Sequence, residues 1–172
     1  MNRSVRVVVS LVALAVAMGG CPGNKGGPSA ITANKMNSSD LTPPVSSVVS
    51  SDILAREPLA NTASVKHILI SWSDLAEMFQ GQQDSRAAKR SKADAEAEVR
   101  SLVKQLAGGA DFDSVMKAHS EDSGSAKSGQ AFTVTPDAHL VIEFRQLSLR
   151  LNVGEVGVCQ SDYGFHIIKR IT

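Results

Sequence analysis

The sequence predicts an α+β fold in which helices surround a small, twisted, mainly antiparallel sheet. Three observations lead to this prediction. A short apolar run, VKHILI, lies near the middle of the chain, an amphipathic helical stretch begins at Ser91, and the chain ends in a hairpin that includes YGFHIIKRI. Strands from opposite ends of one domain are therefore expected to pair side by side.

The first element is a strand from Val65 to Ser71. It is rich in β-branched residues and apolar on both faces after Lys66, which is typical of a central strand. His67 shares one face of this strand with Val65. The stretch that follows is polar and predicts a long loop, and its basic residues favour a solvated face, with an anion site as the alternative: Arg86, Lys89, Arg90 and Lys92.

Capping residues mark the helices that come next. Ser91 and Asp94 form an acidic variant of the capping box, and apolar residues recur on one face until Gly108 ends the run. Asp111 is expected to cap a second helix that ends near His119. A third helix is predicted from Leu140 to Leu149, and a terminal hairpin from two strands, Val156–Gln160 and Phe165–Ile171.

The N-terminal region predicts export. Arg3 and Arg6 precede an apolar run from Val7 to Met18, so residues 1–20 are interpreted as a signal peptide. Cys21 follows two glycines and resembles the acylated cysteine of a bacterial lipobox. Residues 21–60 are then a lipidated N-terminus and flexible tether that attaches the protein to a membrane, and residues 61–172 are the folded domain. The alternative is an ordinary cleavable signal with an incidental cysteine.

Composition and motifs exclude several classes of protein. The 18 Lys and Arg residues nearly balance the 17 Asp and Glu residues, which argues against nucleic acid as a partner. The histidines and cysteines do not follow metal-ligand spacing, so no metal is expected. The Gly-x-Ser-x-Gly motif of many serine hydrolases does not occur.

The candidate site combines two strands and one loop. Pairing of the first and last strands would bring together His67 and His166, and the loop SEDSGSAKSGQ would add the carboxylate of Asp122. Coupled groups of this kind can orient one another and shape a local field. The structural alternative is that the histidines are satisfied core residues and that Asp122 caps a turn.

Four segments in order resemble the parvulin family of peptidyl-prolyl cis/trans isomerases: VKHILI, DFDSVMKAHSEDSGSAKSG, FRQLSLRLNVGEVG and YGFHIIKRI. The resemblance runs from about Ser64 to Thr172. It implies catalytic roles for His67, Asp122 and His166. It also implies a proline pocket formed by Phe132, Leu140 and Phe144, with Leu140 on the same helix as Phe144.

The resemblance further implies a rotamase of the bacterial cell envelope that acts on unfolded or proline-containing polypeptide clients without a cofactor. One departure concerns the loop. The family usually continues it with Gly-Gly-Asp-Leu-Gly and an aromatic residue, whereas this chain has Gly129-Gln130-Ala131-Phe132. A non-catalytic, membrane-tethered holdase with the same fold is therefore the second hypothesis, and a passive structural lipoprotein is the third.

Overall fold

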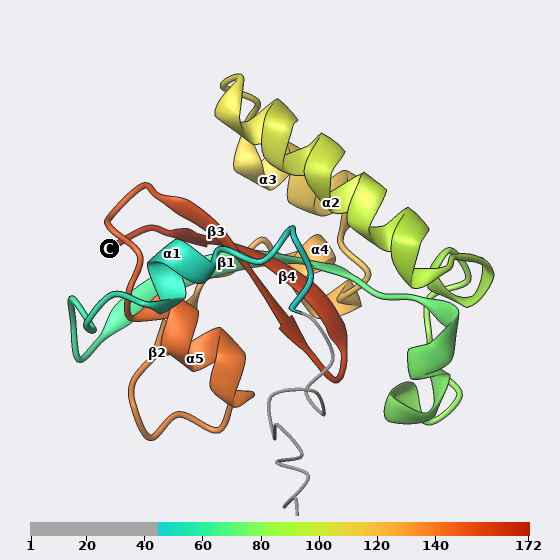
Figure 1. Ribbon diagram of the computed structural model, residues 1–172, viewed down its shortest axis with the longest axis horizontal. Helices are drawn as coiled ribbons and strands as arrows, with labels where there is room; N and C mark the ends of the chain where they lie inside the picture. The colour runs from blue at the N-terminus through green and yellow to red at the C-terminus, as the bar shows by residue number, and fades with distance from the viewer. Residues whose placement is uncertain (1–44) are drawn as a thin grey trace, which may run out of the picture. The chain divides into compact units, whose positions relative to one another are not determined.

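The computed structural model describes residues 45–172 and contains one four-stranded antiparallel sheet with the strand order β2-β1-β4-β3 (Figure 1). The strands are β1 (Ala63–Ile70), β2 (Phe132–Val134), β3 (Val156–Ser161) and β4 (Gly164–Arg170). The α-helices are α1 (Ser51–Leu54), α2 (Lys92–Ala107), α3 (Phe112–His119), α4 (Ser123–Ser128) and α5 (Ile142–Ser148). Two 3₁₀ segments, η2 (Ser73–Phe79) and η3 (Ala87–Lys89), connect β1 to α2. This is the predicted α+β architecture, with helices around a small antiparallel sheet.

The pairing of β1 with β4 determines which residues share a face. His67 lies opposite Ile168, and Leu69 lies opposite His166. Because side chains alternate along a strand, both histidines point to the same side of the sheet. The prediction that the first and last strands pair is confirmed, and β1 is central, as its two-sided apolar pattern indicated.

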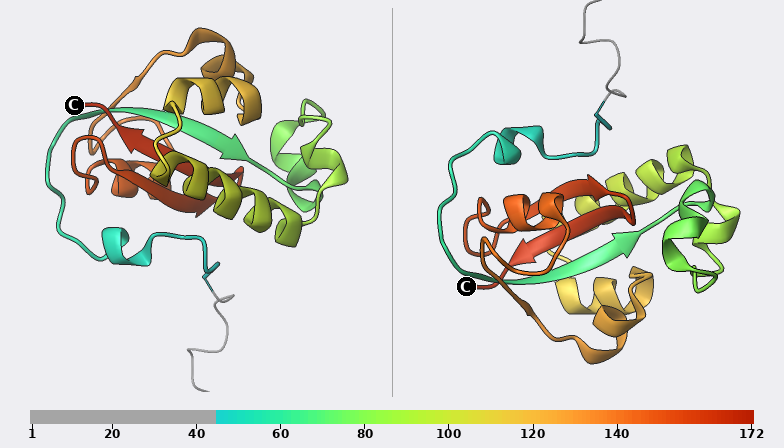
Figure 2. Two further views of the ribbon diagram at one scale, coloured as in Figure 1. Left: turned by 90° about the horizontal axis from the view of Figure 1, so that it is seen from above. Right: turned by 90° about the horizontal axis from the view of Figure 1, so that it is seen from below.

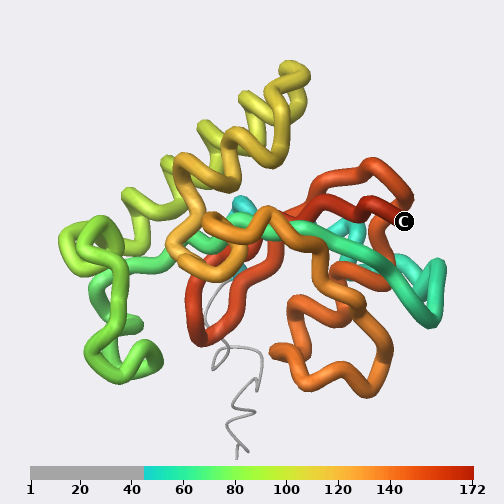
Figure 3. Tube along the Cα trace, turned by 180° about the vertical axis from the view of Figure 1, so that it is seen from behind, coloured from blue at the N-terminus to red at the C-terminus, as the bar shows by residue number. Residues whose placement is uncertain are grey.

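Two clusters of buried side chains cover the two faces of the sheet. Helices α2 and α3 pack on one face, against residues such as Ile68, Phe165 and Ile167. Helix α5 packs on the other face, where Val65, Ile168 and Leu147 are buried. Views from above and below show these two layers (Figure 2), and the view from behind shows the α4 segment beside β1 (Figure 3).

The two long helices begin where the capping residues predicted. Ser91 and Asp94 form a reciprocal capping box at the start of α2, and Gly108 is the C-cap after its last residue, Ala107. Asp111 caps α3 by accepting a hydrogen bond from the Ser114 amide at 2.9 Å. Each cap satisfies amides that would otherwise lack partners in the first helical turn.

Three elements differ from the sequence-based expectation. The third predicted helix is shorter than Leu140–Leu149, because α5 begins only at Ile142. The loop SEDSGSAKSGQ contains the short helix α4, which Asp122 caps. Strand β2 was not predicted, since three residues give too short a pattern to recognise.

Part of the segment assigned to the tether packs on the domain. Ser50 exchanges two hydrogen bonds with Val158 of β3, at 2.9 and 3.0 Å. Nη1 of Arg56 donates to both carboxylate oxygens of Glu155, and Ile53 is buried in the cluster around α5. The sequence places the start of the domain near residue 61, whereas this compact region begins earlier. The predicted signal peptide of residues 1–20, Cys21 and the tether up to residue 44 lie outside the described residues.

A glycine closes the hairpin next to the end of β1, and it generates a stability prediction. Gly164 has a φ of +134°, and a Cβ atom there would lie 2.6 Å from the carbonyl oxygen of Ile70. Gly154→Ala serves as the control, because Gly154 also has a positive φ, +83°, but open space around it. We expect Gly154→Ala to lower the free energy of unfolding by about 1–2 kcal/mol and Gly164→Ala by about 3 kcal/mol or more. Urea denaturation measures both values, and equal losses would contradict the argument.

Candidate active site

The two histidines of the sheet and one capping carboxylate form a continuous hydrogen-bonded network. Nε2 of His67 lies 3.0 Å from Oδ2 of Asp122, and Nδ1 of His67 lies 3.3 Å from Nδ1 of His166. Nε2 of His166 lies 2.8 Å from Oγ of Ser161, which in turn accepts a hydrogen bond from the Tyr163 amide at 3.1 Å. The network therefore joins β1, the start of α4 and the β3–β4 hairpin.

Asp122 both caps a helix and contacts His67, two positions that its sequence context presents as alternatives. Its carboxylate caps α4 by accepting hydrogen bonds from the amides of Gly124 and Ser125, at 3.2 and 3.3 Å. It also accepts a hydrogen bond from the Ser125 hydroxyl while it contacts His67. The hydrogen bond from His67 is the largest of the effects that hold the pKa of Asp122 well below its usual range, against the opposing effect of burial. Asp122 is consequently ionised at neutral pH.

The charge on Asp122 sets the direction of the hydrogen bonds. An ionised carboxylate only accepts, so Nε2 of His67 carries the proton of that bond. In neutral His67, Nδ1 then accepts from Nδ1 of His166, and Nε2 of His166 accepts from the Ser161 hydroxyl. Burial, together with the neighbouring His67, lowers the pKa of His166 to about 3, which keeps His166 neutral.

Aromatic rings surround His67. The ring of Phe132 meets it edge-on at a centroid distance of 5.3 Å, and the ring of Phe144 does so at 5.2 Å. Phe144 also contacts the ring of His166 at 5.5 Å. These rings limit the contact of the imidazoles with water, and a low local dielectric strengthens their electrostatic effects.

A cavity of about 280 Å³ opens over this network. All six residues that the sequence assigned to catalysis and the proline pocket line it: His67, Asp122, Phe132, Leu140, Phe144 and His166. Leu140 contributes from the loop before α5 rather than from the helix itself, which corrects its expected position. The other assigned residue, Cys21, lies outside the described residues.

Sequence reasoning missed further residues of this site. His139, Val141 and Tyr163 also line the cavity. Ser125 lies three residues after Asp122, and this spacing could have predicted its bond to the capping carboxylate. Ser161 ends β3 and Tyr163 lies in the turn that follows, and only the pairing of β3 with β4 places them beside His166.

The favoured prediction of a solvated basic face holds for Arg86 and Lys89, which are exposed, but not for Arg90. The side chain of Arg90 is only 10% exposed and pairs with Glu121 and Glu98. Arg86 pairs with Asp84 and donates hydrogen bonds to the carbonyls of Ala118 and Ser120, both at 3.2 Å. These two guanidinium groups already have partners within the domain.

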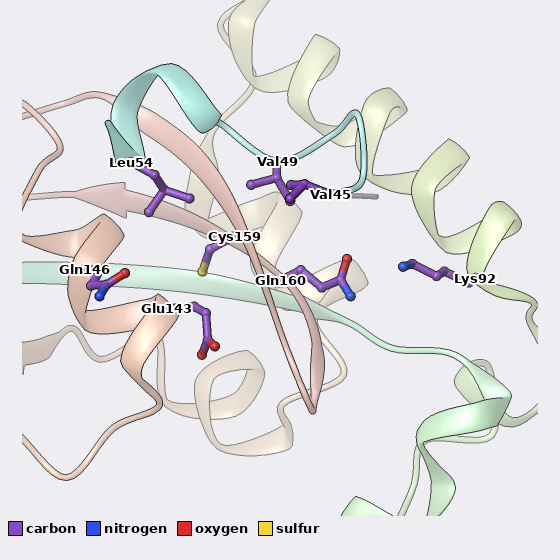
Figure 4. Close-up of a pocket in the computed structure, with 8 residues that line it drawn as sticks. All are labelled: Val45, Val49, Leu54, Lys92, Glu143, Gln146, Cys159 and Gln160. Atoms are coloured by element: carbon purple, nitrogen blue, oxygen red, sulfur yellow. The ribbon is translucent and has the colours of Figure 1, made fainter. Parts of the chain in front are cut away.

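A second cavity, of about 310 Å³, lies between the N-terminal segment (residues 45–54), α5 and β3 (Figure 4). Cys159 lines it, from a fully buried position on the same face of the sheet as His166. Burial, reinforced by the charge of Glu143, raises the pKa of the Cys159 thiol. A protonated thiol is a poor nucleophile, so Cys159 serves as a small buried residue of β3.

Neither a metal cluster nor a membrane span is found in the part of the chain that the structure describes. Within residues 45–172, the histidine, cysteine and acidic side chains do not gather into a group of three or more that could hold a metal ion. The helices of the same range are too short or too polar to cross a bilayer.

Comparisons with known proteins place the chain in a family. The family model for the PPIC-type PPIase domain matches residues 51–171, well over half of the chain. Foldase protein PrsA from Geobacillus kaustophilus (strain HTA426) is 30% identical over 112 residues, which are 64% of this chain and 40% of that protein. Chaperone SurA from Nitrosospira multiformis is 33% identical over 107 residues, which are 62% of this chain and 21% of that protein. The match thus spans less than half of the length of either relative.

Solved structures show the same fold. The solution structure of TbPIN1 has a TM-score of 0.56 and 23% sequence identity, and the match covers 66% of this chain and 100% of that one. Peptidyl-prolyl isomerase ESS1 from Candida albicans has a TM-score of 0.53 and 19% sequence identity. That match covers 65% of this chain and 63% of the other.

The low pKa of His166 predicts that the domain loses stability in mild acid. The pKa of this side chain is about 3 in the folded protein and 6.5 when it is exposed. Below pH 6.5 the unfolded chain therefore binds a proton that the folded protein does not, so stability falls as the pH drops from 6.5 toward 3. We expect His166 to account for about 2 kcal/mol of loss between pH 7 and pH 5.

Urea denaturation at both pH values measures this loss. His166→Gln should show a smaller difference between the two pH values than the wild type, whatever its absolute stability. His119→Gln is the matched control on the surface, because His119 is 39% exposed. An unchanged pH difference in His166→Gln would show that His166 is not buried in its neutral form.

Proposed function

The chain belongs to the family of PPIC-type peptidyl-prolyl isomerases, the parvulins, and from this premise we propose that it isomerises X-Pro bonds in exported proteins and so assists their folding in the cell envelope. The observation that carries the proposal is that a hydrogen-bonded polar network lines the same cavity as a set of apolar side chains. The network is that of His67, Asp122 and His166, and the cavity walls are Phe132, Leu140 and Phe144. The names of the PrsA and SurA relatives, foldase and chaperone, support a role in folding.

The proposed chemistry is rotation about one amide bond. Resonance makes this barrier about 18–20 kcal/mol, while the two isomers of an X-Pro bond differ by only about 0.5–1 kcal/mol. No covalent bond forms or breaks, so the task is to stabilise the twisted amide more than the planar one.

The cavity offers two kinds of contact for this task. Its apolar walls would hold the prolyl ring, which fixes one side of the rotating bond. The two imidazoles would face the amide within a preorganised network, in which Asp122 holds the orientation of His67. Preorganised dipoles act without the reorganisation that water would need, and this lowers the barrier for the twisted state.

We further propose that the chain is exported and anchored. Residues 1–20 would act as the signal peptide, Cys21 as the lipidated N-terminus, and the following residues as the tether to the domain. The basic residues and apolar run before Cys21 support this proposal. Two or more acyl chains would hold the protein stably on a membrane.

Isomer exchange on a short prolyl peptide tests the catalytic proposal. We expect the wild-type protein to accelerate exchange, and Asp122→Asn to lower kcat/KM at least about tenfold, which corresponds to about 1.4 kcal/mol of transition-state stabilisation. Asparagine still caps a helix, so the fold should persist. Asp111→Asn is the matched control, because Asp111 caps α3 in the same way outside the site.

Two outcomes would contradict the catalytic proposal. Peptide binding without acceleration by the wild type would select the holdase hypothesis instead. Equal rates in Asp122→Asn and the wild type would remove Asp122 from the mechanism.

Fractionation of cells tests the anchor. Cys21→Ser should move the protein from the membrane fraction to the soluble fraction, because the thiol that would carry the lipid is lost. Intact-mass analysis of the wild type should show a lipid-modified Cys21 at the N-terminus. An unmodified Cys21, or cleavage at another position, would refute the anchor.

A further inference from the structure

We propose that Glu121 is a positioning residue, which together with Arg90 holds the carboxylate of Asp122 against His67. The inference rests on the proposed function, since it concerns the same site. It starts from a buried charge that the proposed chemistry does not use. The side chain of Glu121 is only 1% exposed, and its carboxylate contacts Arg90 and Ser71 rather than the histidines.

Ser120 and Glu121 form hydrogen bonds with β1 beyond the point where its pairing with β2 ends. Strand β2 pairs with β1 only from Ala63 to Val65, so the same edge of β1 needs other partners farther along. The amide of Glu121 donates to the carbonyl of Leu69 at 2.9 Å, and the hydroxyl of Ser120 accepts from the amide of Leu69 at 3.1 Å. These two bonds fix Ser120 and Glu121 in register with β1.

The side chain of Glu121 extends these hydrogen bonds to Ser71, two residues beyond Leu69. Its Oε2 accepts a hydrogen bond from the Ser71 amide at 2.7 Å, and its Oε1 accepts one from Nη1 of Arg90 at 2.6 Å. The same Nη1 donates to the carbonyl of Ser71 at 2.9 Å. Glu121, Arg90 and Ser71 thus form a closed ring of contacts in which each residue binds the other two.

A further ion pair ties this ring to α2. Nη2 of Arg90 lies 2.7 Å from Oε2 of Glu98. Burial raises the pKa of Glu121, but the Ser71 amide and the guanidinium of Arg90 favour its charged form. The charge therefore depends on Arg90 for compensation, and loss of either partner would leave a buried group without one.

Asp122 is the next residue after Glu121, so the ring sets where its backbone begins. The 3.0 Å contact between Asp122 and His67 requires the segment that pairs with β1 at Ser120 and Glu121 to turn away from the strand at a fixed position. The cap of α4 fixes the other side of Asp122. Asp122 is therefore held on both sides, by α4 after it and by the Glu121–Arg90 pair before it.

A double-mutant cycle tests whether Glu121 acts through Asp122. Glu121→Gln keeps the size of the side chain and an acceptor for the Ser71 amide, but removes the charge that Arg90 pairs with. We expect it to lower kcat/KM for prolyl exchange at least about fivefold in the wild-type background and less than about twofold in the Asp122→Asn background. Equal losses in both backgrounds would overturn the proposal.

The ring protons of His67 give a second measurement that needs no activity. NMR of the full chain labelled at the histidine ring nitrogens should resolve the Nε2–H that His67 donates to Asp122. Glu121→Gln should shift or broaden this signal, and an unchanged signal would overturn the proposal. Since the signal exists whether or not the protein is an isomerase, this result is independent of the proposed function.

Two further variants complete the design. Glu155→Gln removes a carboxylate that also binds an arginine, Arg56, at 2.8 and 2.9 Å, and it should leave both measurements unchanged. Arg90→Lys keeps the positive charge but not the planar fork that binds Glu121, Glu98 and Ser71 together. It replaces Glu121→Gln if that variant does not fold, and its loss of rate should likewise shrink in the Asp122→Asn background.

Discussion

The antiparallel register of β1 and β4 is the constraint on which the site depends. It places Leu69 opposite His166 and therefore directs the two imidazoles to one face of the sheet. A slip by one residue would send every side chain of a strand to the opposite face, and would separate His67 from His166. The register is protected because both faces of the central strands are buried. Packing on the face away from the site thus maintains the geometry of the site itself.

Two adjacent carboxylates in this protein have opposite electrostatic character. Asp122 meets a histidine, a hydroxyl and two amides, and its pKa is lowered. Glu121 is more deeply buried, and the cost of removing its charge from water raises its pKa. The two neighbouring carboxylates therefore act differently. Asp122, nearer the cavity, is a stable charge beside the imidazoles, and Glu121, more deeply buried, connects this part of the chain to Arg90.

Local patterns in the sequence were sufficient for elements whose partners are close along the chain. The caps at Ser91 and Asp111 and the terminal hairpin are of this kind, and the structure confirms them. The helix after Asp122 was missed because SGSAKS has no apolar periodicity, and its cap is its main determinant. The carboxylate partners of Arg90 come from Glu98 and Glu121, and no pattern near Arg90 predicts their approach. The three-residue pairing of β2 with β1 depends on tertiary contacts in the same way.

The hydrogen bonds between Ser50 and Val158 attach the N-terminal segment to the domain, and they also cover part of the sheet edge. Strand β3 forms one border of the sheet, and an uncovered border can recruit another extended chain. Ser50 occupies both the amide and the carbonyl of Val158, so this part of the border is no longer a template for a foreign strand. The entry of the chain into the domain therefore also shields this part of the sheet from edge-to-edge pairing with another extended chain.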